Sequence, residues 1–268
     1  MDRYVVFGNP VEHSLSPRIH AQFARQTGQT MDYQRALLPI DGFANGADAF
    51  FSDGGKGANV TVPFKADAYG WVSQRSALAA AAGAVNTIVW DGRLSVGHNT
   101  DGLGLIRDLS VNMGINLTAA RVLLIGAGGA ARGVLRPLLD SGIASLCIAN
   151  RTAARAEELC TEVGPDDLQR VKAVSMASPG EGFDVVINAT SAGLAGQGAL
   201  VPPACVGGSV CYDMFYGGQT PFCRWAVEAQ AARVVDGLGM LVEQAAEAFH
   251  LWRGVRPDTL AVLGDLRK

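Results

Sequence analysis

The chain has 268 residues, of which 49% are hydrophobic and 18% charged, and its formal net charge is −3. This composition excludes a disordered chain, and the balance of charge provides no basic surface field for nucleic acid. No apolar stretch reaches the length of about 18 residues that could span a bilayer. The apolar run at residues 4–7 ends at Gly8-Asn9-Pro10, before a signal peptide could form. We therefore expect a cytoplasmic protein without a nucleic-acid or membrane partner.

The cysteines are odd in number and widely spaced, and none belongs to a CxxC pair: Cys147, Cys160, Cys205, Cys211 and Cys223. This spacing predicts neither a disulfide framework nor a zinc site. We expect free thiols in a reducing compartment and no bound metal. The sequence leaves the choice between a monomer and a homodimer open.

The first third of the chain predicts strands at residues 4–7 and 57–62, the second of which stops at Pro63. Between them, Ser16-Pro17 is typical of a helix start, with Ser16 as the N-cap and proline in the first turn. Residues 85–90 and 94–96 flank Asp91-Gly92, which predicts an antiparallel hairpin.

Further along the chain, strands are predicted at residues 122–125, 146–149, 184–189 and 210–212, separated by segments of helical length. This rhythm is typical of a doubly wound sheet with parallel strands. Residues 240–252 predict a helix whose broad apolar face must be buried, and we expect it to return to the first domain. The fold class is therefore α/β with two domains. Residues 1–101 and 238–268 form one, with a mainly parallel sheet, and residues 102–237 form a Rossmann-type domain.

The strand at residues 122–125 leads into a loop of the form G-x-G-x-x-A. Its first glycine permits a tight turn, its second allows backbone to approach a pyrophosphate, and its alanine permits close packing of helix on strand. The helix that follows offers free N–H groups to phosphate. The loop therefore predicts dinucleotide binding by Gly126, Ala127, Gly128, Gly129, Ala130 and Ala131.

The residues after the second strand of this domain indicate which dinucleotide is bound. An acidic residue there would hold the ribose 2′-hydroxyl of NAD, whereas this chain has Asn150-Arg151-Thr152, followed by Arg155. Two guanidinium groups can hold a 2′-phosphate, and no carboxylate at this place repels one. We therefore expect NADP(H) as the cofactor.

The residues alone do not decide where catalysis takes place. Lys65 follows the strand that carries Asn59 and Thr61, and Asp101 lies in Asn99-Thr100-Asp101-Gly102 at the expected domain boundary. Reduction of a carbonyl by a nicotinamide cofactor needs a proton donor, for which a lysine is suited. However, a lone lysine is typically a solvated surface charge, and a lone aspartate at such a position is typically a helix N-cap.

Seven motifs occur in an order that resembles the shikimate dehydrogenase family over essentially the full chain. They are Gly8 to Pro17, Gly57 to Lys65, Gly83 to Thr87, Asn99 to Gly102, the loop from Gly126 to Ala131, Asn150-Arg151-Thr152, and Asp236 to Leu241. The resemblance implies NADPH-dependent reduction of 3-dehydroshikimate to shikimate, with the first domain binding the substrate and the second binding NADP. It also implies a substrate that lies between the two domains.

The resemblance also implies a role for individual residues. Lys65 and Asp101 would form the catalytic pair, with Lys65 as general acid and base. Ser14 and Ser16 would bind the substrate carboxylate. The other substrate contacts would come from Asn59, Thr61, Asn86, Tyr216 and Gln244, and Thr190, Met214, Gly237 and Met240 would lie near the nicotinamide.

Two other functions remain open from the sequence. A quinate dehydrogenase, or one acting on both quinate and shikimate, would share the fold and the lysine–aspartate pair, although Arg151 disfavours an enzyme that uses NAD. A non-catalytic NADP(H)-sensing module would bind the cofactor but would have no need of Lys65 with Asp101. His98, which precedes the Asn99 motif, is interpreted either as a surface histidine or as a neighbour that perturbs Asp101.

Overall fold

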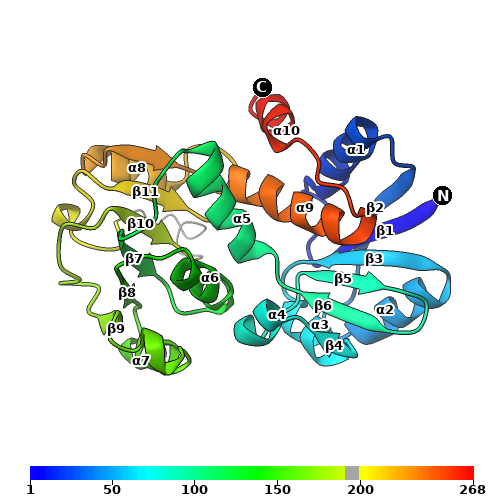
Figure 1. Cartoon of the computed structure of the whole chain (residues 1–268), viewed down its shortest axis with the longest axis horizontal. Coiled ribbons are helices and arrows are strands. Elements are labelled where there is room, and N and C mark those ends of the chain that lie inside the picture. The colour runs from blue at the N-terminus through cyan, green and yellow to red at the C-terminus, as the bar shows by residue number, and fades with distance from the viewer. Residues whose placement is uncertain (191–198) are drawn as a thin grey trace. The chain divides into compact units, whose positions relative to one another are not determined.

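The computed structural model describes residues 1–190 and 199–268, which divide into two compact units. Unit 1 comprises Met1–Gly104 with Leu241–Lys268, and unit 2 comprises Leu105–Met240. The division falls within two helices, α5 (Asp101–Arg107) and α9 (Leu238–Arg253) (Figure 1). No helix in the described part of the chain is long and apolar enough to cross a membrane.

Unit 1 is built on a mixed sheet. Its described strands are ordered β2-β1-β3-β5-β6-β4, and all neighbours run parallel except β5, which is antiparallel to both β3 and β6. The hairpin predicted around Asp91-Gly92 is thus confirmed as β5–β6. The strands are β1 (Asp2–Gly8), β2 (Met31–Leu37), β3 (Gly55–Val60), β4 (Gln74–Arg75), β5 (Thr87–Trp90) and β6 (Ser95–His98). The helices are α1 (Ser16–Thr27), α2 (Phe43–Ser52), α3 (Lys65–Trp71), α4 (Ala77–Ala82), part of α9, and α10 (Thr259–Leu266).

The two faces of the unit 1 sheet have different cores. Val5, Phe7, Ala58 and Val60 project to one face, where they pack with residues of α2 and α3. The alternate strand positions face α1 and α9, so that Tyr4 contacts Trp252 with ring centroids 4.7 Å apart. The Trp252 indole donates from Nε1 to the Ile88 carbonyl at 2.9 Å, and lies where a side chain at Gly57 would be. The expected return of the last long helix to the first sheet is therefore confirmed.

Unit 2 contains the doubly wound sheet that the sequence predicts. Its described strands are all parallel and are ordered β12-β11-β10-β7-β8-β9, the strand order of a Rossmann fold. The strands are β7 (Arg121–Ile125), β8 (Ser145–Ala149), β9 (Val171–Val174), β10 (Val185–Asn188), β11 (Val210–Asp213) and β12 (Arg233–Val235). The helices are α6 (Gly129–Asp140), α7 (Ala153–Thr161) and α8 (Pro221–Glu228), with the π-helix η1 (Asp108–Asn112) and the 3₁₀ turns η2 (Pro165–Asp167) and η4 (Pro203–Cys205).

Alternation along the buried strands produces one core on each face of this sheet. Val122 and Leu124 of β7 pack with residues of α6 and α7, whereas Leu123 and Ile125 pack with residues of α8. Both faces of a parallel sheet are thereby covered, which is why its strands are apolar at nearly every position.

His20 of α1 is completely buried on the aromatic face of unit 1. Its imidazole stacks on the Tyr33 ring, with centroids 4.3 Å apart and planes 10° from parallel. Burial lowers the pKa of His20 from 6.5 to about 3, so that the folded protein holds a neutral imidazole at neutral pH.

This burial should make the fold acid-sensitive. Between about pH 6 and pH 4 the unfolded chain binds a proton at His20 that the folded chain does not, so stability decreases as pH falls, by about 1 kcal/mol per pH unit. We expect His20→Leu to flatten the dependence of the unfolding free energy on pH by this amount, measured by chemical denaturation across that range. The matched control, His250→Leu at an exposed position of α9, should keep the wild-type slope. An unchanged slope in His20→Leu would contradict the account.

Candidate active site

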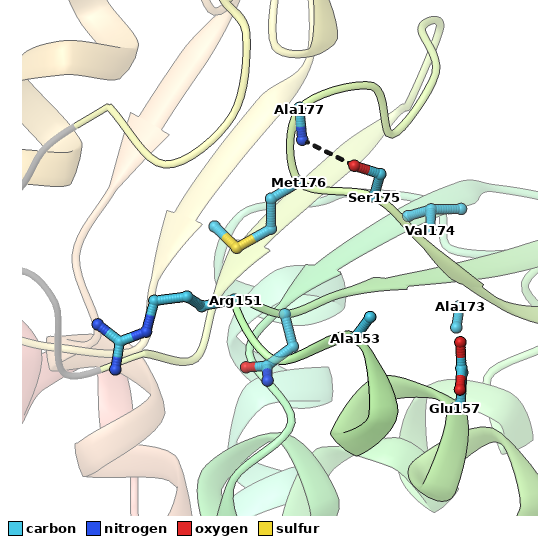
Figure 2. Close-up of a pocket in the computed structure, with 9 residues that line it drawn as sticks. Arg151, Ala153, Glu157, Ala173, Val174, Ser175, Met176 and Ala177 are labelled. Atoms are coloured by element: carbon cyan, nitrogen blue, oxygen red, sulfur yellow. Dashed lines mark hydrogen bonds between the residues drawn. The ribbon is translucent and has the colours of Figure 1, made fainter.

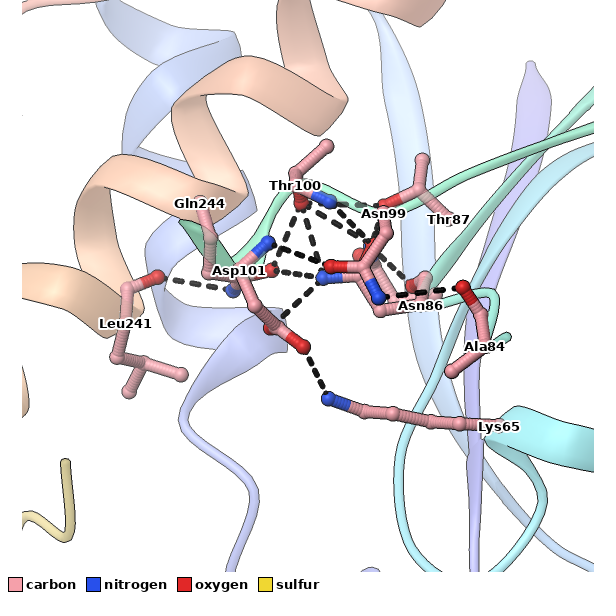
Figure 3. A network of polar contacts seen from close by, with 10 residues as sticks. Lys65, Ala84, Asn86, Thr87, Asn99, Thr100, Asp101, Leu241 and Gln244 are labelled. Carbon is pink, nitrogen blue, oxygen red and sulfur yellow. Dashed lines mark hydrogen bonds and ion pairs between the residues drawn. The ribbon is translucent and has the colours of Figure 1, made fainter. Parts of the chain in front are cut away.

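An ion pair occupies the carboxyl-end side of the unit 1 sheet. Lys65 is the first residue of α3 and Asp101 is the first residue of α5. The Lys65 Nζ atom lies 2.6 Å from Asp101 Oδ2 (Figure 3), and the two side chains are 31% and 16% exposed. The pair is thus ordered, and part of it remains accessible to a ligand.

Asp101 is free to bind Lys65 because another residue satisfies the start of its helix. The Asp101 N–H donates to Asn99 Oδ1 at 3.2 Å, and Asn99 Nδ2 donates to the Ala84 carbonyl at 3.1 Å. The side chain of Asn99, which is buried, thereby takes the capping role that the sequence alone assigns to Asp101.

Asn86 holds the other oxygen of the carboxylate. Its Nδ2 donates to Asp101 Oδ1 at 2.8 Å and to Thr100 Oγ1 at 3.0 Å. Its Oδ1 accepts from the backbone N–H of Thr100 at 2.9 Å, which fixes the orientation of the amide. Asp101 therefore accepts one hydrogen bond on each carboxylate oxygen, from Asn86 and from Lys65.

Gln244, on the part of α9 that belongs to unit 1, lies beside this network (Figure 3). Its Nε2 donates to the Leu241 carbonyl one turn earlier at 2.9 Å, so its Oε1 faces Asn86 and Thr100, each at 3.4 Å. These are long contacts, and they leave the amide able to bind a ligand hydroxyl.

Ser14 and Ser16 lie together at the start of α1, but Ser16 is not the N-cap that the sequence predicts. The helix begins at Ser16 with Leu15 at the cap position, and the Ser16 N–H donates to Ser14 Oγ at 3.3 Å. The proline at position 17 lets the helix start one residue earlier, since the first-turn N–H groups need no helical partner. Arg35 holds this loop by donating to the Ser14 carbonyl at 2.6 and 3.1 Å.

Asn59 and Thr61 flank the end of β3. Asn59 is buried, and its Nδ2 donates to Thr87 Oγ1 at 3.0 Å and to the Asn86 carbonyl at 3.2 Å. Thr61 is half-buried, and its N–H donates to the Phe7 carbonyl at 2.9 Å. In unit 1, then, Lys65, Asn86, Asp101 and Gln244 form one network, which Asn59 joins through Thr87 and Asn86.

The glycine loop in unit 2 has the backbone that dinucleotide binding requires. Gly126 has φ +116°, and a side chain on it would meet the Ala189 carbonyl at 3.1 Å. Gly128 caps α6, and among the described residues no atom beyond the adjoining backbone lies within 4 Å of the positions that side chains at Gly128 and Gly129 would take. Ala131 is completely buried against the sheet and Ala127 is largely buried at the turn, whereas Ala130 is exposed in the first turn of α6. With respect to the described part of the chain, the N-terminus of α6 is therefore open to a phosphate.

A pocket of about 450 Å³ lies at the ends of β8 and β9 (Figure 2). Arg151 and Asn150 line it together with apolar residues, and Glu157 lies away from the Arg151 guanidinium. Thr152 and Arg155 are exposed nearby and are not among the residues that line the pocket in the described chain. The lining residues are Asn150, Arg151, Ala153, Glu157, Ala173, Val174, Ser175, Met176 and Ala177.

Arg151 brings a guanidinium group to this pocket, and the sequence predicts that this group holds the 2′-phosphate of NADP(H). We expect Arg151→Ala to raise the KM for NADP⁺ about tenfold or more and to change the KM for NAD⁺ less than about twofold, because one charge-assisted contact is lost. Initial rates with each cofactor measure this. Lys172→Ala, which removes an exposed cation of β9 that does not line the pocket, is the control. An unchanged cofactor preference in Arg151→Ala would contradict this role.

The residues expected near the nicotinamide gather around the ends of β10 and β11. Thr190 donates from its N–H and its hydroxyl to Asn188 Oδ1, at 3.0 and 2.7 Å, and Met214 donates from its N–H to the Asn188 carbonyl at 3.0 Å. Gly237 must be glycine, because a side chain there would collide with the Met214 carbonyl. Buried Asn188 thus organises this group, and no pattern in the sequence marks it.

Met240 and Tyr216 complete the predicted set in unit 2. The Met240 N–H donates to the hydroxyl of buried Tyr212 at 3.2 Å, and that hydroxyl donates to Asp108 Oδ2 at 2.6 Å. Tyr216 is half-buried after β11, and burial raises the pKa of its phenol.

His98, in unit 1, is half-buried, and burial lowers the pKa of its imidazole, which favours the neutral form.

A dinucleotide turn in one unit, and an ammonium–carboxylate pair among amides and hydroxyls in the other, define a nicotinamide-dependent oxidoreductase. Three family models match the chain: "Shikimate dehydrogenase substrate binding domain" at residues 6–88, "Shikimate / quinate 5-dehydrogenase" at 109–195, and "Shikimate 5'-dehydrogenase C-terminal domain" at 237–264. The curated Shikimate dehydrogenase (NADP(+)) of Alkalilimnicola ehrlichii is 54% identical over 99% of this chain and 98% of its own length. The chain belongs to the shikimate dehydrogenase family.

Solved structures agree with this assignment. An Ael1 enzyme from Pseudomonas putida has a TM-score of 0.94 at 45% identity, covering 99% of this chain and 98% of its own. Shikimate 5-dehydrogenase from Thermus thermophilus, solved in complex with NADP(H) and shikimate, has a TM-score of 0.87 at 31% identity, covering 100% of this chain and 99% of its own. The two-domain α/β fold class predicted from the sequence is therefore confirmed.

Proposed function

We propose that this chain catalyses the reversible, NADPH-dependent reduction of 3-dehydroshikimate to shikimate, as a step of chorismate and aromatic amino acid biosynthesis. Lys65 is the general acid and base, and Asp101 is its partner. The observation that carries this proposal is the 2.6 Å pair of Lys65 and Asp101 beside the amides of Asn86 and Gln244. Relatives about half identical over the full chain, named for NADP⁺ and shikimate, support it.

The same proposal assigns substrate binding and cofactor binding to different parts of the chain. Residues 1–101 and 238–268 bind the substrate, and residues 102–237 bind NADP(H). Ser14 and Ser16 donate hydroxyls to the substrate carboxylate. The ring hydroxyls meet Asn59, Thr61, Asn86, Asp101 and Gln244, and Tyr216 provides a further contact.

The residues of unit 2 fit NADP(H), which would supply or accept the hydride. The open N-terminus of α6 suits the pyrophosphate, and Arg151 in its pocket suits the 2′-phosphate, with Arg155 and Thr152 exposed beside it. Thr190, Met214, Gly237 and Met240 would surround the nicotinamide.

In this reaction Lys65 transfers one proton. As the carbonyl carbon gains a hydride, its oxygen gains the proton from Lys65 Nζ, and in the reverse direction neutral Lys65 removes that proton. The ammonium also stabilises negative charge that develops on the oxygen. Asp101 keeps Nζ in place, and Asn86 keeps Asp101 in place.

Oxidation of shikimate tests the proposal. The purified protein with NADP⁺ and shikimate should form NADPH, followed by its absorbance, and should do so more slowly with NAD⁺. Quinate, assayed side by side, tests the second candidate, which the shikimate and quinate family model over residues 109–195 favours. Binding of NADP⁺ without turnover of either acid would contradict the proposal and support a cofactor-sensing module.

A further inference from the structure

We propose that Tyr33 is a positioning residue of the substrate site: its hydroxyl fixes the amide of Asn59, through which Asn59 would bind the substrate. The inference rests on the proposed function and extends it to β2, a strand that none of the assigned site residues occupies.

The register of the sheet places Tyr33 within reach of Asn59. Tyr33 of β2 pairs with Tyr4 of β1, and Asn59 of β3 pairs with Val6 of β1. Tyr4 and Val6 are two residues apart on one strand and therefore share a face of the sheet. The two side chains therefore project to the same face, towards α1 and α9. The Tyr33 hydroxyl donates to Asn59 Oδ1 at 2.7 Å.

From Asn59 to Asp101, each side chain donates a hydrogen bond to the next one in the series. Asn59 Nδ2 donates to Thr87 Oγ1 at 3.0 Å, and the Thr87 hydroxyl donates to Asn86 Oδ1 at 3.0 Å. Asn86 Nδ2 then donates to Asp101, which accepts from Lys65 on its other oxygen (Figure 3). A directed series thus runs from the Tyr33 phenol to the catalytic pair.

This arrangement determines how Asn59 can bind a substrate. Both hydrogens of its amide are used within the protein, on Thr87 and on the Asn86 carbonyl, whereas Oδ1 accepts one bond and can accept a second. Asn59 would therefore accept a bond from a substrate hydroxyl. Without the Tyr33 proton, buried Oδ1 loses the donor that contacts it at 2.7 Å, and the amide is held in this orientation less firmly, by the two bonds of Nδ2 alone.

His20 holds the Tyr33 ring in place. The parallel stack of the two rings lies against α9, with His20 and Trp252 centroids 5.3 Å apart. Burial raises the pKa of the Tyr33 phenol, so the hydroxyl keeps the proton that it donates. Tyr33 is consequently a fixed donor, and the sequence signal for it is absent because its partners are distant along the chain.

Tyr33→Phe tests this inference, since it keeps the ring and its stacking and removes only the hydroxyl. Tyr4→Phe is the matched control: it removes a hydroxyl that contacts Arg253 at 3.3 Å on the same face of the sheet. We expect Tyr33→Phe to raise the KM for shikimate about threefold to tenfold, with kcat and the KM for NADP⁺ within about twofold of wild type. Tyr4→Phe should change none of the three, and the Tm values of the two variants should be similar.

A double variant separates positioning from general damage to the fold. If Tyr33 acts through Asn59, Tyr33→Phe should raise the KM no further in an Asn59→Ala background. A KM for Tyr33→Phe equal to that of Tyr4→Phe, or effects that multiply in the double variant, would overturn the inference while the proposed function stands. A wild-type protein that does not oxidise shikimate would overturn the proposed function and this inference with it.

Discussion

Replacement of Lys65 with alanine is expected to lower kcat for shikimate oxidation by about 10²- to 10⁴-fold, with little change in KM. The variant loses both the proton carrier and the positive charge near the reacting oxygen, and neither Asn86 nor Gln244 carries a proton that it can transfer at neutral pH. The carbon chain of Lys65 is only partly buried, so its removal should cost little stability.

Steady-state kinetics with saturating NADP⁺ measure this effect. Lys56→Ala is the control, because Lys56 is an exposed lysine on β3, in the same unit, and has no assigned role. It should retain wild-type kcat. A Lys65→Ala variant with kcat close to wild type would remove the proton-transfer role from this residue.

The second large effect is expected from Asp101→Asn, which should lower kcat about 100-fold. The carboxylate accepts from Lys65 on Oδ2 and from Asn86 on Oδ1. An amide of the same shape presents its NH₂ group to one of these two donors, so one hydrogen bond is replaced by a repulsive contact. Either Lys65 or Asn86 must then move from its position.

Asp67→Asn is the matched control, since Asp67 is an exposed carboxylate in the first turn of α3, two residues after Lys65. It tests whether loss of any negative charge near Lys65 is sufficient. We expect it to retain kcat within about twofold. Equal losses in Asp67→Asn and Asp101→Asn would show that general charge, and not the contact with Lys65, accounts for the effect.

Most strands and helices of unit 2 can be predicted from the sequence, because the patterns that indicate them lie within short segments of the chain. Apolar runs such as Val122–Ile125 alternate with helical segments, and the glycine turn directly follows the first of them. In unit 1, the Asp91-Gly92 turn correctly predicts the antiparallel hairpin. Strand β2 (Met31–Leu37) gave no comparable signal, because it lies at the sheet edge and most of its polar residues are partly exposed.

The candidate site is only partly readable from the residues. Lys65 and Asp101 are 36 positions apart, and composition could not choose between a catalytic pair and two ordinary surface roles. The order of motifs, through the family resemblance, selected them, and the structure then places them in contact. Tyr33, Asn99 and Asn188 act on the site residues through hydrogen bonds that depend on the tertiary fold, so no pattern along the chain marks them.

Amine rescue tests most directly whether the amine of Lys65 carries the proton. In Lys65→Ala, methylamine added to the shikimate and NADP⁺ assay at fixed pH and ionic strength can enter the space of the missing side chain. If Lys65 carries the proton, kcat of Lys65→Ala should rise in proportion to the concentration of free-base methylamine, whereas wild type and Lys56→Ala should not respond. A Lys65→Ala rate that is independent of amine concentration would contradict this role.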